Sequence, residues 1–295
     1  IWQRVEVLYT DRVLPPPEMA PNLRWLQFHF AGVDFAASHP LVARPELIAT
    51  TLSGAAAPQV AEYALTALLA LAHRLPAVMK NQAKMEWPND RWTRFVPREL
   101  RGSTVGIIGY GSIGRELARL LQPFGCTVLA AKRDVFHPED SGYLPEGMGD
   151  PEGSLFTRLY PIEALGSMLK TCDFAVVCLP LTPKTRGLID EEILKSMKKG
   201  AYLVDVGRGG VVDAGALQEA LKDGHLAAVA LDVFPEEPLP SGNPLWHLPE
   251  SIISPHVAGI SGVYLQRAAA LFERNLRSYL EGEPLLNRFD PERGY

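Results

Sequence analysis

The chain has 295 residues, of which 47% are hydrophobic and 21% charged, a composition typical of a globular protein long enough for about two domains. The net charge is −5, and the absence of a basic stripe argues against nucleic acid as a partner while leaving small anionic ligands open. The longest apolar stretch, residues 64–71, is too short to span a bilayer and predicts a buried helix.

The cysteines and the start of the chain indicate the cellular setting. Cys126, Cys172 and Cys178 fit no disulfide framework and no metal-ligand spacing, so we expect buried thiols in the reducing cytoplasm and no metal site. No signal-peptide pattern is present. Because the chain opens at Ile1 and runs almost directly into a strand-like segment, we expect some N-terminal sequence to be missing.

Short apolar segments separated by turn signals make up the first 57 residues. Val5, Val7 and Tyr9 alternate with polar neighbours, which predicts a half-buried strand, and residues 23–30 and 46–51 are further strand candidates. A helix over about 59–75 follows and is predicted to close at Pro76. It is apolar nearly all round, so we expect it between two domains.

From Ser103 onward the sequence alternates regularly between strand and helix patterns. Strands are predicted at 105–108, 127–131, 174–179, 201–206, 227–232 and 252–254, with a loop at 136–160 and a helix at 214–221 capped by Asp213. Such alternation predicts a parallel sheet with helices on both faces. An amphipathic helix over 265–280 is expected to return to the first domain, so that the chain crosses twice and leaves a cleft.

One glycine-rich turn has the spacing of a dinucleotide site. It follows the strand at 105–108 and opens a helix, the context that makes a G-x-G-x-x-G pattern informative. The first glycine permits a tight turn, the second a close approach of the pyrophosphate, and the third close packing of helix on strand. The predicted cofactor-binding residues are Gly109, Tyr110, Gly111, Ser112, Ile113 and Gly114.

The end of the next strand bears on the choice of cofactor. An acidic residue there binds the adenosine ribose of NAD, whereas this chain has Lys132 and Arg133 followed by Asp134. Two cations attract a 2′-phosphate, so NADP(H) is favoured over NAD(H). The alternative is that both cations point into solvent and Asp134 reaches back to the ribose.

Three later segments place ionisable residues just after predicted strands, where ligands bind in open α/β sheets. They are Val-Asp-Val-Gly-Arg-Gly-Gly at 204–210, Leu-Asp-Val-Phe-Pro-Glu-Glu-Pro-Leu at 231–239, and Ser-Pro-His-Val-Ala-Gly at 254–259. Further segments are Ala-Gly-Val-Asp at 31–34, Val-Ala-Glu at 60–62 and Leu-Pro-Leu-Thr-Pro-Lys-Thr-Arg-Gly at 179–187. Together these segments closely resemble the D-2-hydroxyacid dehydrogenase family, and most of all its glyoxylate and hydroxypyruvate reductases; the resemblance covers nearly the whole chain.

The resemblance implies an α/β fold of two Rossmann-like parallel-sheet domains with a cleft between them. A discontinuous, flavodoxin-like substrate domain is expected at 1–75 plus 260–295, and an NAD(P)-binding domain at 76–259. It implies an NAD(P)-dependent oxidoreductase that transfers a hydride between the cofactor and a 2-oxo or D-2-hydroxy acid. A homodimer is also implied, with residues 85–101 as a candidate contact.

The family's roles carry over to matching positions. Arg208 would bind the substrate carboxylate and polarise the ketone. His256 would be the general acid in reduction, held by Glu237, whose charge favours the imidazolium. The remaining implied site residues are Ala31 and Gly32, whose N–H groups complete the carboxylate cradle, and Pro180, Val206 and Asp232, which line the cofactor site.

Some features leave alternatives open. Asp205 stands where the family commonly has asparagine, so its role in bracing the backbone is altered. His29 and His39 are near the predicted substrate loop and are candidates for substrate contact, whereas His73, His225 and His247 are predicted to be structural or solvated. The alternative functions are a formate- or phosphite-type dehydrogenase and a nucleotide-sensing scaffold similar to the C-terminal-binding corepressors.

Overall fold

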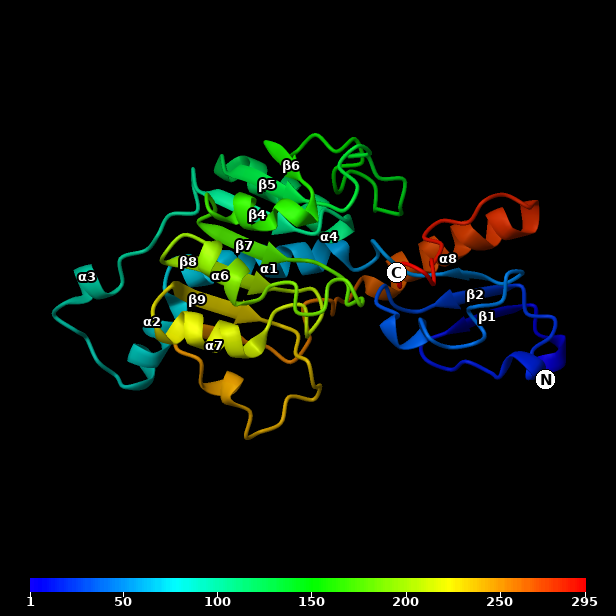
Figure 1. Ribbon diagram of the computed structural model, residues 1–295, viewed down its shortest axis with the longest axis horizontal. Helices are drawn as coiled ribbons and strands as arrows, with labels where there is room; N and C mark the ends of the chain where they lie inside the picture. The colour runs from blue at the N-terminus through cyan, green and yellow to red at the C-terminus, as the bar shows by residue number, and fades with distance from the viewer. The chain divides into compact units, whose positions relative to one another are not determined.

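The computed structural model describes residues 1–295, which separate into two compact units (Figure 1). Unit 1 comprises Ile1–Pro58, Ser141–Met148 and Ile260–Tyr295, and unit 2 comprises Gln59–Asp140 and Gly149–Gly259. The division at 259/260 coincides with the predicted boundary. Residues 59–75 lie in unit 2 rather than with the first domain, and residues 141–148, predicted as part of a cofactor-domain loop, lie in unit 1.

Unit 1 is built on a small parallel sheet in the order β1-β2-β3, with β1 at Val7–Thr10, β2 at Trp25–Phe28 and β3 at Ile48–Thr50. All three predicted strands are present; β2 and β3 are shorter than predicted, and β1 begins at Val7 and ends at Thr10. The helix α8 (Tyr264–Glu281) stacks Phe272 and Tyr279 on the fully buried Trp25, with ring centroids 5.3 and 5.4 Å apart. The short 3-10 helices η1 (Trp2–Arg4), η2 (Pro17–Met19) and η3 (Asp34–Ala36) complete the unit.

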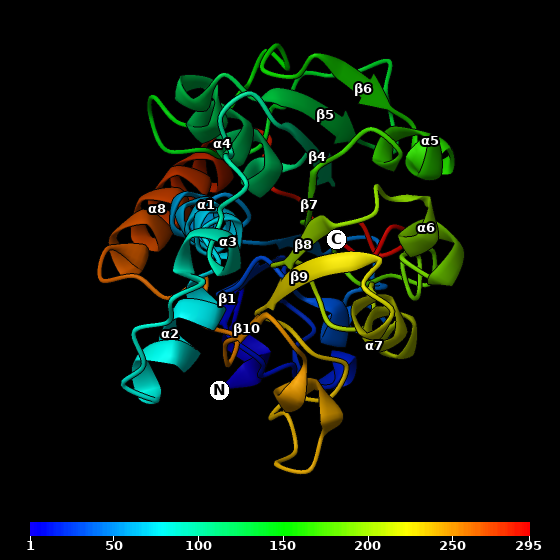
Figure 2. The same ribbon diagram turned by 90° about the vertical axis from the view of Figure 1, so that its left-hand side faces the viewer.

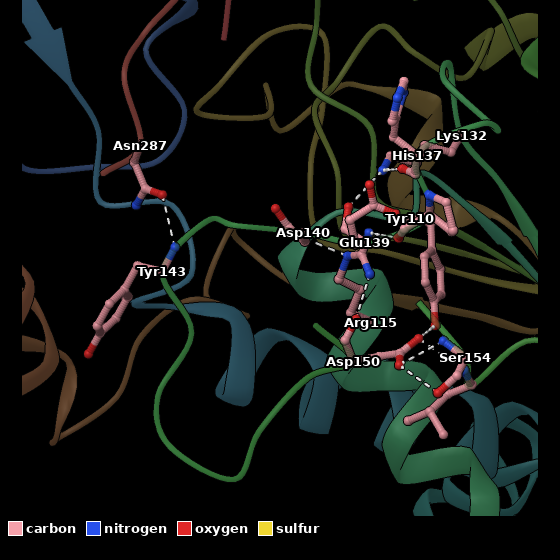
Figure 3. A network of polar contacts seen from close by, with 12 residues as sticks. Tyr110, Arg115, Lys132, His137, Glu139, Asp140, Tyr143, Asp150, Ser154 and Asn287 are labelled. Atoms are coloured by element: carbon pink, nitrogen blue, oxygen red, sulfur yellow. Dashed lines mark hydrogen bonds and ion pairs between the residues drawn. The ribbon is translucent and has the colours of Figure 1, made fainter. Parts of the chain in front are cut away.

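The segment Ser141–Met148 is held in unit 1 by backbone contacts. The Tyr143 N–H donates to Asn287 Oδ1 at 3.1 Å (Figure 3). A Cβ placed on Gly54 would lie 1.8 Å from the Tyr143 carbonyl oxygen, and Gly54 has φ +88°. Only glycine combines a positive φ with the absence of a Cβ, so Gly54 allows the close contact between this segment and the rest of unit 1.

Unit 2 contains a seven-stranded, wholly parallel sheet in the order β10-β9-β8-β7-β4-β5-β6. Its strands are β4 (Thr104–Ile108), β5 (Thr127–Ala131), β6 (Arg158–Tyr160), β7 (Phe174–Val177), β8 (Ala201–Asp205), β9 (Leu226–Leu231) and β10 (Ser251–Ile253). The order reverses between β4 and β7, the switch point at which open α/β sheets bind ligands. The predicted parallel sheet is confirmed; the edge strand β6 falls inside the predicted loop, and its three residues carry too little pattern to be recognised.

Helices cover both faces of this sheet, as predicted. Figure 2 shows α5 (Leu165–Leu169), α6 (Glu191–Ser196) and α7 (Ala214–Lys222) on one face, and α1 (Ala57–Ala72) and α4 (Ser112–Leu121) on the other. Asp213 caps α7 by accepting a hydrogen bond from the Ala216 N–H at 2.8 Å, which confirms that predicted cap. The 3-10 helices are η4 (Gln122–Phe124), η5 (Ile162–Ala164) and η6 (Pro244–His247).

The predicted helix at 59–75 is divided in two. α1 ends at Ala72, Arg74 adopts a left-handed conformation with φ +53°, and α2 (Leu75–Ala83) begins with Pro76 in its first turn. Proline is favoured in a first helical turn because its missing N–H needs no partner there. Pro76 therefore starts the second helix instead of only closing the first.

Beyond α2 the chain runs out from unit 2 on an extended loop that carries α3 (Arg91–Arg94) (Figure 1). We call residues 84–97 the arm. Its large apolar side chains are exposed, with Met85, Trp87 and Trp92 at 94%, 84% and 76% of their full area.

None of the helices combines the length and the apolar character that a membrane-spanning segment needs.

Candidate active site and dinucleotide site

The glycine turn joins β4 to α4 with the geometry that the sequence predicted. Gly109 has φ +105°, and the N–H groups of Gly109 and Tyr110 both donate to the Ala131 carbonyl at 3.0 Å. A Cβ on Gly114 would meet the Gly109 carbonyl oxygen at 2.4 Å, whereas a Cβ on Gly111 would meet no protein atom within 4 Å. No side chain caps the N-terminus of α4. Open space at Gly111 beside uncapped helical N–H groups fits a dinucleotide pyrophosphate.

The two cations after β5 have different surroundings. Lys132 donates from Nζ to the carbonyl oxygens of His137 and Glu139 at 2.5 and 3.3 Å, and partial burial lowers its pKa. Arg133 is exposed. Asp134 accepts from the Phe136 N–H at 3.0 Å and contacts His137 Nδ1 at 2.7 Å. Lys132 and Asp134 thus both shape the loop that follows the strand.

A buried polar network joins that loop to the glycine turn (Figure 3). The fully buried Arg115 of α4 donates to the carbonyl oxygens of Asp150 and Pro138, both at 2.5 Å, and its Nε lies 3.3 Å from Asp140 Oδ2. Tyr110 donates from its hydroxyl to Asp150 Oδ2 at 2.6 Å. Burial works to raise the pKa of Asp150, but hydrogen bonds from Tyr110 and from two backbone N–H groups together lower it. Asp150 is therefore an anion that fixes the loop against the turn.

The loop that carries Arg208 begins where β8 ends. Arg208 Nη1 donates to the Gly207 carbonyl at 2.9 Å. A Cβ on Gly209 would lie 1.9 Å from the backbone of Phe234. Gly209 therefore lets the loop after β8 pack against the loop after β9, and Arg208 and Glu237 come from adjacent loops at the carboxyl edge of one sheet.

His256 and Glu237 form the predicted pair. Glu237 accepts the Phe234 N–H through Oε1 at 2.9 Å, and its Oε2 lies 2.7 Å from His256 Nδ1. The histidine side chain stays 41% exposed, and its backbone has φ +53°, a conformation that a non-glycine residue adopts at a cost of about 1–3 kcal/mol. Because Nδ1 faces the carboxylate, Nε2 is the atom available to a substrate.

Asp232 organises the turn that leads to His256. Its buried carboxylate accepts hydrogen bonds from Ser254 Oγ at 2.6 Å and from the N–H groups of Val257 and Ala258, both at 2.9 Å. The Tyr63 hydroxyl of α1 bonds in turn to Ser254 Oγ. These contacts hold residues 254–258 on both sides of His256.

Other predicted residues lie in the same unit. Val206 is buried and donates its N–H to Val177 O at 3.1 Å, and the Pro180 carbonyl accepts from Thr185 Oγ1 at 2.6 Å. The end of β7 also approaches the glycine turn, since a Cβ on Gly109 would lie 3.0 Å from the Cys178 carbonyl oxygen. Ala31 and Gly32 belong to unit 1, after β2, and are not among the residues brought together in unit 2.

The two histidines proposed near substrate have partners within unit 1. His29 Nδ1 contacts the Tyr9 hydroxyl at 2.6 Å, and His39 Nδ1 accepts the Leu41 N–H at 3.2 Å. Sequence reasoning gave no role to Ser254, Tyr63 or Asp150. Ser254 is the first residue of a recognised motif, but Tyr63 bonds to Ser254 and Asp150 to Tyr110, both distant in sequence, so no local pattern could have identified these contacts.

The comparisons agree with this arrangement. Residues 65–258 match the family model described as "D-isomer specific 2-hydroxyacid dehydrogenase, NAD binding domain". The chain is 33% identical to a glyoxylate reductase of Thermofilum pendens, over 94% of this chain and 78% of that protein. It is 31% identical to a chloroplastic/mitochondrial formate dehydrogenase of Arabidopsis thaliana, over 80% of this chain and 58% of that one.

A solved structure is similar over nearly the full length. It is a D-isomer specific 2-hydroxyacid dehydrogenase from Xanthobacter autotrophicus Py2 in complex with NADPH and MES, with a TM-score of 0.81 and 32% identity over 97% of this chain and 85% of that one. Fold and site thus define a nicotinamide-dinucleotide oxidoreductase. The chain belongs to the D-isomer specific 2-hydroxyacid dehydrogenase family, and it transfers a hydride between the cofactor and 2-oxo or 2-hydroxy acids.

Proposed function

We propose that the chain reduces small 2-oxo acids of the glyoxylate or hydroxypyruvate type with NADPH. The observation that carries the proposal is the contact between Glu237 Oε2 and His256 Nδ1, at the same sheet edge as Arg208 and the glycine turn. A carboxylate behind an imidazole and a forked cation nearby suit an anionic ketone substrate. The named relatives include glyoxylate reductases from three archaea.

Each side chain has a distinct task in this proposal. The glycine turn and the N-terminus of α4 hold the pyrophosphate of the dinucleotide, which supplies the hydride when bound. Arg208 binds the substrate carboxylate and draws charge from the ketone oxygen. His256 delivers its Nε2 proton to that oxygen, and Glu237 stabilises the imidazolium. Ala31 and Gly32 remain proposed substrate-binding residues on the basis of the family resemblance.

The preference for NADPH rests mainly on Arg133. Arg133 is exposed just after β5, and its forked guanidinium suits a 2′-phosphate. Lys132 donates to two loop carbonyls and shapes the same loop. The similar structure from Xanthobacter autotrophicus Py2 is described with NADPH, and a glyoxylate/hydroxypyruvate reductase from Sinorhizobium meliloti, 26% identical with a TM-score of 0.78, is described with NADP.

The arm supports the proposal of a homodimer. Its exposed tryptophans flank Arg91, whose guanidinium carbon lies 5.9 and 4.7 Å from the ring centroids of Trp87 and Trp92. Aromatic and arginine side chains of this kind dominate protein interfaces. A second copy of the chain is the proposed partner. We place this dimer in the cytoplasm, since the three cysteines are free thiols.

A steady-state screen tests the substrate and cofactor together. Initial rates are measured for glyoxylate, hydroxypyruvate and phenylpyruvate with NADPH and with NADH, and for formate and phosphite with both oxidised cofactors. We expect reduction of the 2-oxo acids with a higher kcat/KM for NADPH. A clear preference for NADH would contradict the cofactor proposal, and turnover of formate or phosphite alone would contradict the substrate proposal.

A further inference from the structure

Two buried aspartates stand on neighbouring strands at the carboxyl edge of the sheet of unit 2. Asp205 ends β8 and Asp232 follows β9, and the two residues are only 3% and 1% exposed. The Asp232 N–H donates to the Asp205 carbonyl at 3.0 Å, so the two residues are neighbours across the strands. The negative charge of Asp232 disfavours ionisation of the buried Asp205.

Asp205 has few hydrogen-bond donors for a buried carboxyl group. It accepts one hydrogen bond, from the Gly207 N–H at 3.0 Å, whereas Asp232 accepts three, from Ser254 Oγ, Val257 N–H and Ala258 N–H. A buried carboxylate with a single donor is poorly stabilised as the anion.

The groups that face Asp205 give the same result. They are Cys178 beyond β7, whose pKa is raised by burial and by the Asp205 charge, Asp232 beyond β9, and Arg208 on its own loop. Burial raises the pKa of Asp205 to about 7; the charge of Asp232 adds to this effect, while the Gly207 hydrogen bond and Arg208 oppose it.

We infer that Asp205 is held as a neutral acid beside Arg208, and that its ionisation weakens the hold of this guanidinium on the carboxylate of a 2-oxo acid. Asp205 acts through Arg208 and is a positioning residue. Loss of its proton introduces an anion that competes with the substrate for Arg208 and repels the substrate's own carboxylate. The effect therefore falls on the KM for the 2-oxo acid rather than on kcat.

The variant Asp205→Asn isolates this ionisation, because an amide has the shape of the neutral acid and keeps an oxygen for the Gly207 N–H. The inference rests on the proposed function. Between about pH 6 and about pH 8.5 we expect the wild-type KM for glyoxylate to rise at least about fivefold more than that of the variant, with similar changes in kcat. Equal pH dependence of KM in the two proteins would overturn the inference.

A thermal measurement tests the same ionisation without any substrate. The pKa of Asp205 is higher in the folded protein than in the unfolded chain. The contribution of Asp205 to the free energy of unfolding is therefore fully present below about pH 4 and is lost as pH rises to about 7. The melting temperature of Asp205→Asn, relative to wild type, should therefore be higher at pH 8 than at pH 5. A constant difference would contradict the neutral acid. If Asp205→Asn does not fold, Asp205→Ser gives the same comparison, since a hydroxyl also accepts from Gly207.

The control is Asp213→Asn, an equal change at the exposed N-cap of α7 that asparagine also satisfies. It should match wild type in both measurements, and a widening gap for this variant too would remove the support from the thermal result. The two readouts also separate the proposals. If the function proposed above is wrong, glyoxylate is not reduced, but the difference in melting temperature between Asp205→Asn and wild type still widens with pH. If the inference is wrong, both proteins reduce glyoxylate, and their KM values have the same pH dependence.

Discussion

At the scale of single residues, His256 is held more firmly than its exposure suggests. Its positive φ is a strained conformation, and two sets of contacts maintain it. Glu237 holds the ring through Nδ1, and Asp232 holds the backbone of the two residues that follow. Strain kept at the residue proposed as the proton donor supports the proposal that the direction of its ring matters to the chemistry.

The variant Glu237→Gln tests the electrostatic half of this arrangement. Glutamine keeps an oxygen for the Phe234 N–H but removes the negative charge behind the His256 ring. Because this charge is proposed to support His256 as the proton donor, kcat/KM for reduction should fall about tenfold. Glu236→Gln is the adjacent control and should leave kcat/KM unchanged. An unaltered kcat/KM in Glu237→Gln would refute its role.

Sequence could predict the positions of the candidate site residues, while their roles come from the family resemblance. Arg208, Glu237 and His256 each lie in a loop that follows a segment with strand periodicity, and parallel strands end at one edge. Asp232 was predicted only as a cofactor neighbour. Its role as the acceptor for residues 254–258 requires knowing that β9 and β10 are adjacent, which a single sequence does not report.

At the scale of elements, the glycine turn is the part that local sequence determines most fully. Each glycine has the separate steric reason predicted for it. Gly109 needs its positive φ, Gly114 has no room for a Cβ, and Gly111 faces open space. A Cβ at Gly111 is therefore acceptable to the protein and unacceptable only to the pyrophosphate.

This contrast gives a paired prediction. Gly111→Ala should leave the melting temperature unchanged and weaken NADPH binding by about tenfold or more, measured as Kd by fluorescence titration. Gly114→Ala should lower both the melting temperature and the affinity for NADPH, because its Cβ would overlap the Gly109 carbonyl. Gly242→Ala, whose Cβ would also meet no atom within 4 Å, is the control and should change neither the melting temperature nor the affinity for NADPH. Undiminished NADPH affinity in Gly111→Ala would place the pyrophosphate elsewhere.

Element boundaries were harder to predict than element types. The helix predicted over 59–75 breaks at Arg74, whose left-handed conformation with φ +53° is not signalled by the local sequence pattern. The edge strand β6 pairs only with β5 and lies within a segment rich in proline, glycine and aspartate. Its recognition depends on a partner strand nearly thirty residues away in sequence, so single-sequence periodicity could not detect it.

At the scale of the whole molecule, the chain passes between the two compact units more often than predicted. The expected crossings were near 75 and at 260, whereas residues 141–148 add an excursion into unit 1 from the middle of unit 2. Within unit 1, this segment contacts Gly54 and Asn287 through the Tyr143 backbone. Nothing in the local pattern of a proline- and glycine-rich loop reveals which unit it packs against.

The arm allows a prediction about assembly. If a second copy covers Trp87 and Trp92, the double variant Trp87→Ala/Trp92→Ala should shift the protein from dimer to monomer at micromolar concentration, measured by light scattering after size exclusion. Phe136→Ala removes an equally exposed aromatic side chain outside the arm and should leave the dimer intact. A monomeric wild type, or a dimeric double variant, would contradict the proposal.

The most direct test of the account compares Arg208→Ala and His256→Ala with wild type in glyoxylate reduction and in NADPH binding. Both side chains lie in loops that follow strands of one sheet, while the glycine turn proposed to hold the cofactor is a different segment. The account predicts that kcat/KM falls at least about a hundredfold in each variant, with the Kd for NADPH within about threefold of wild type. Near-normal turnover in either variant would contradict it.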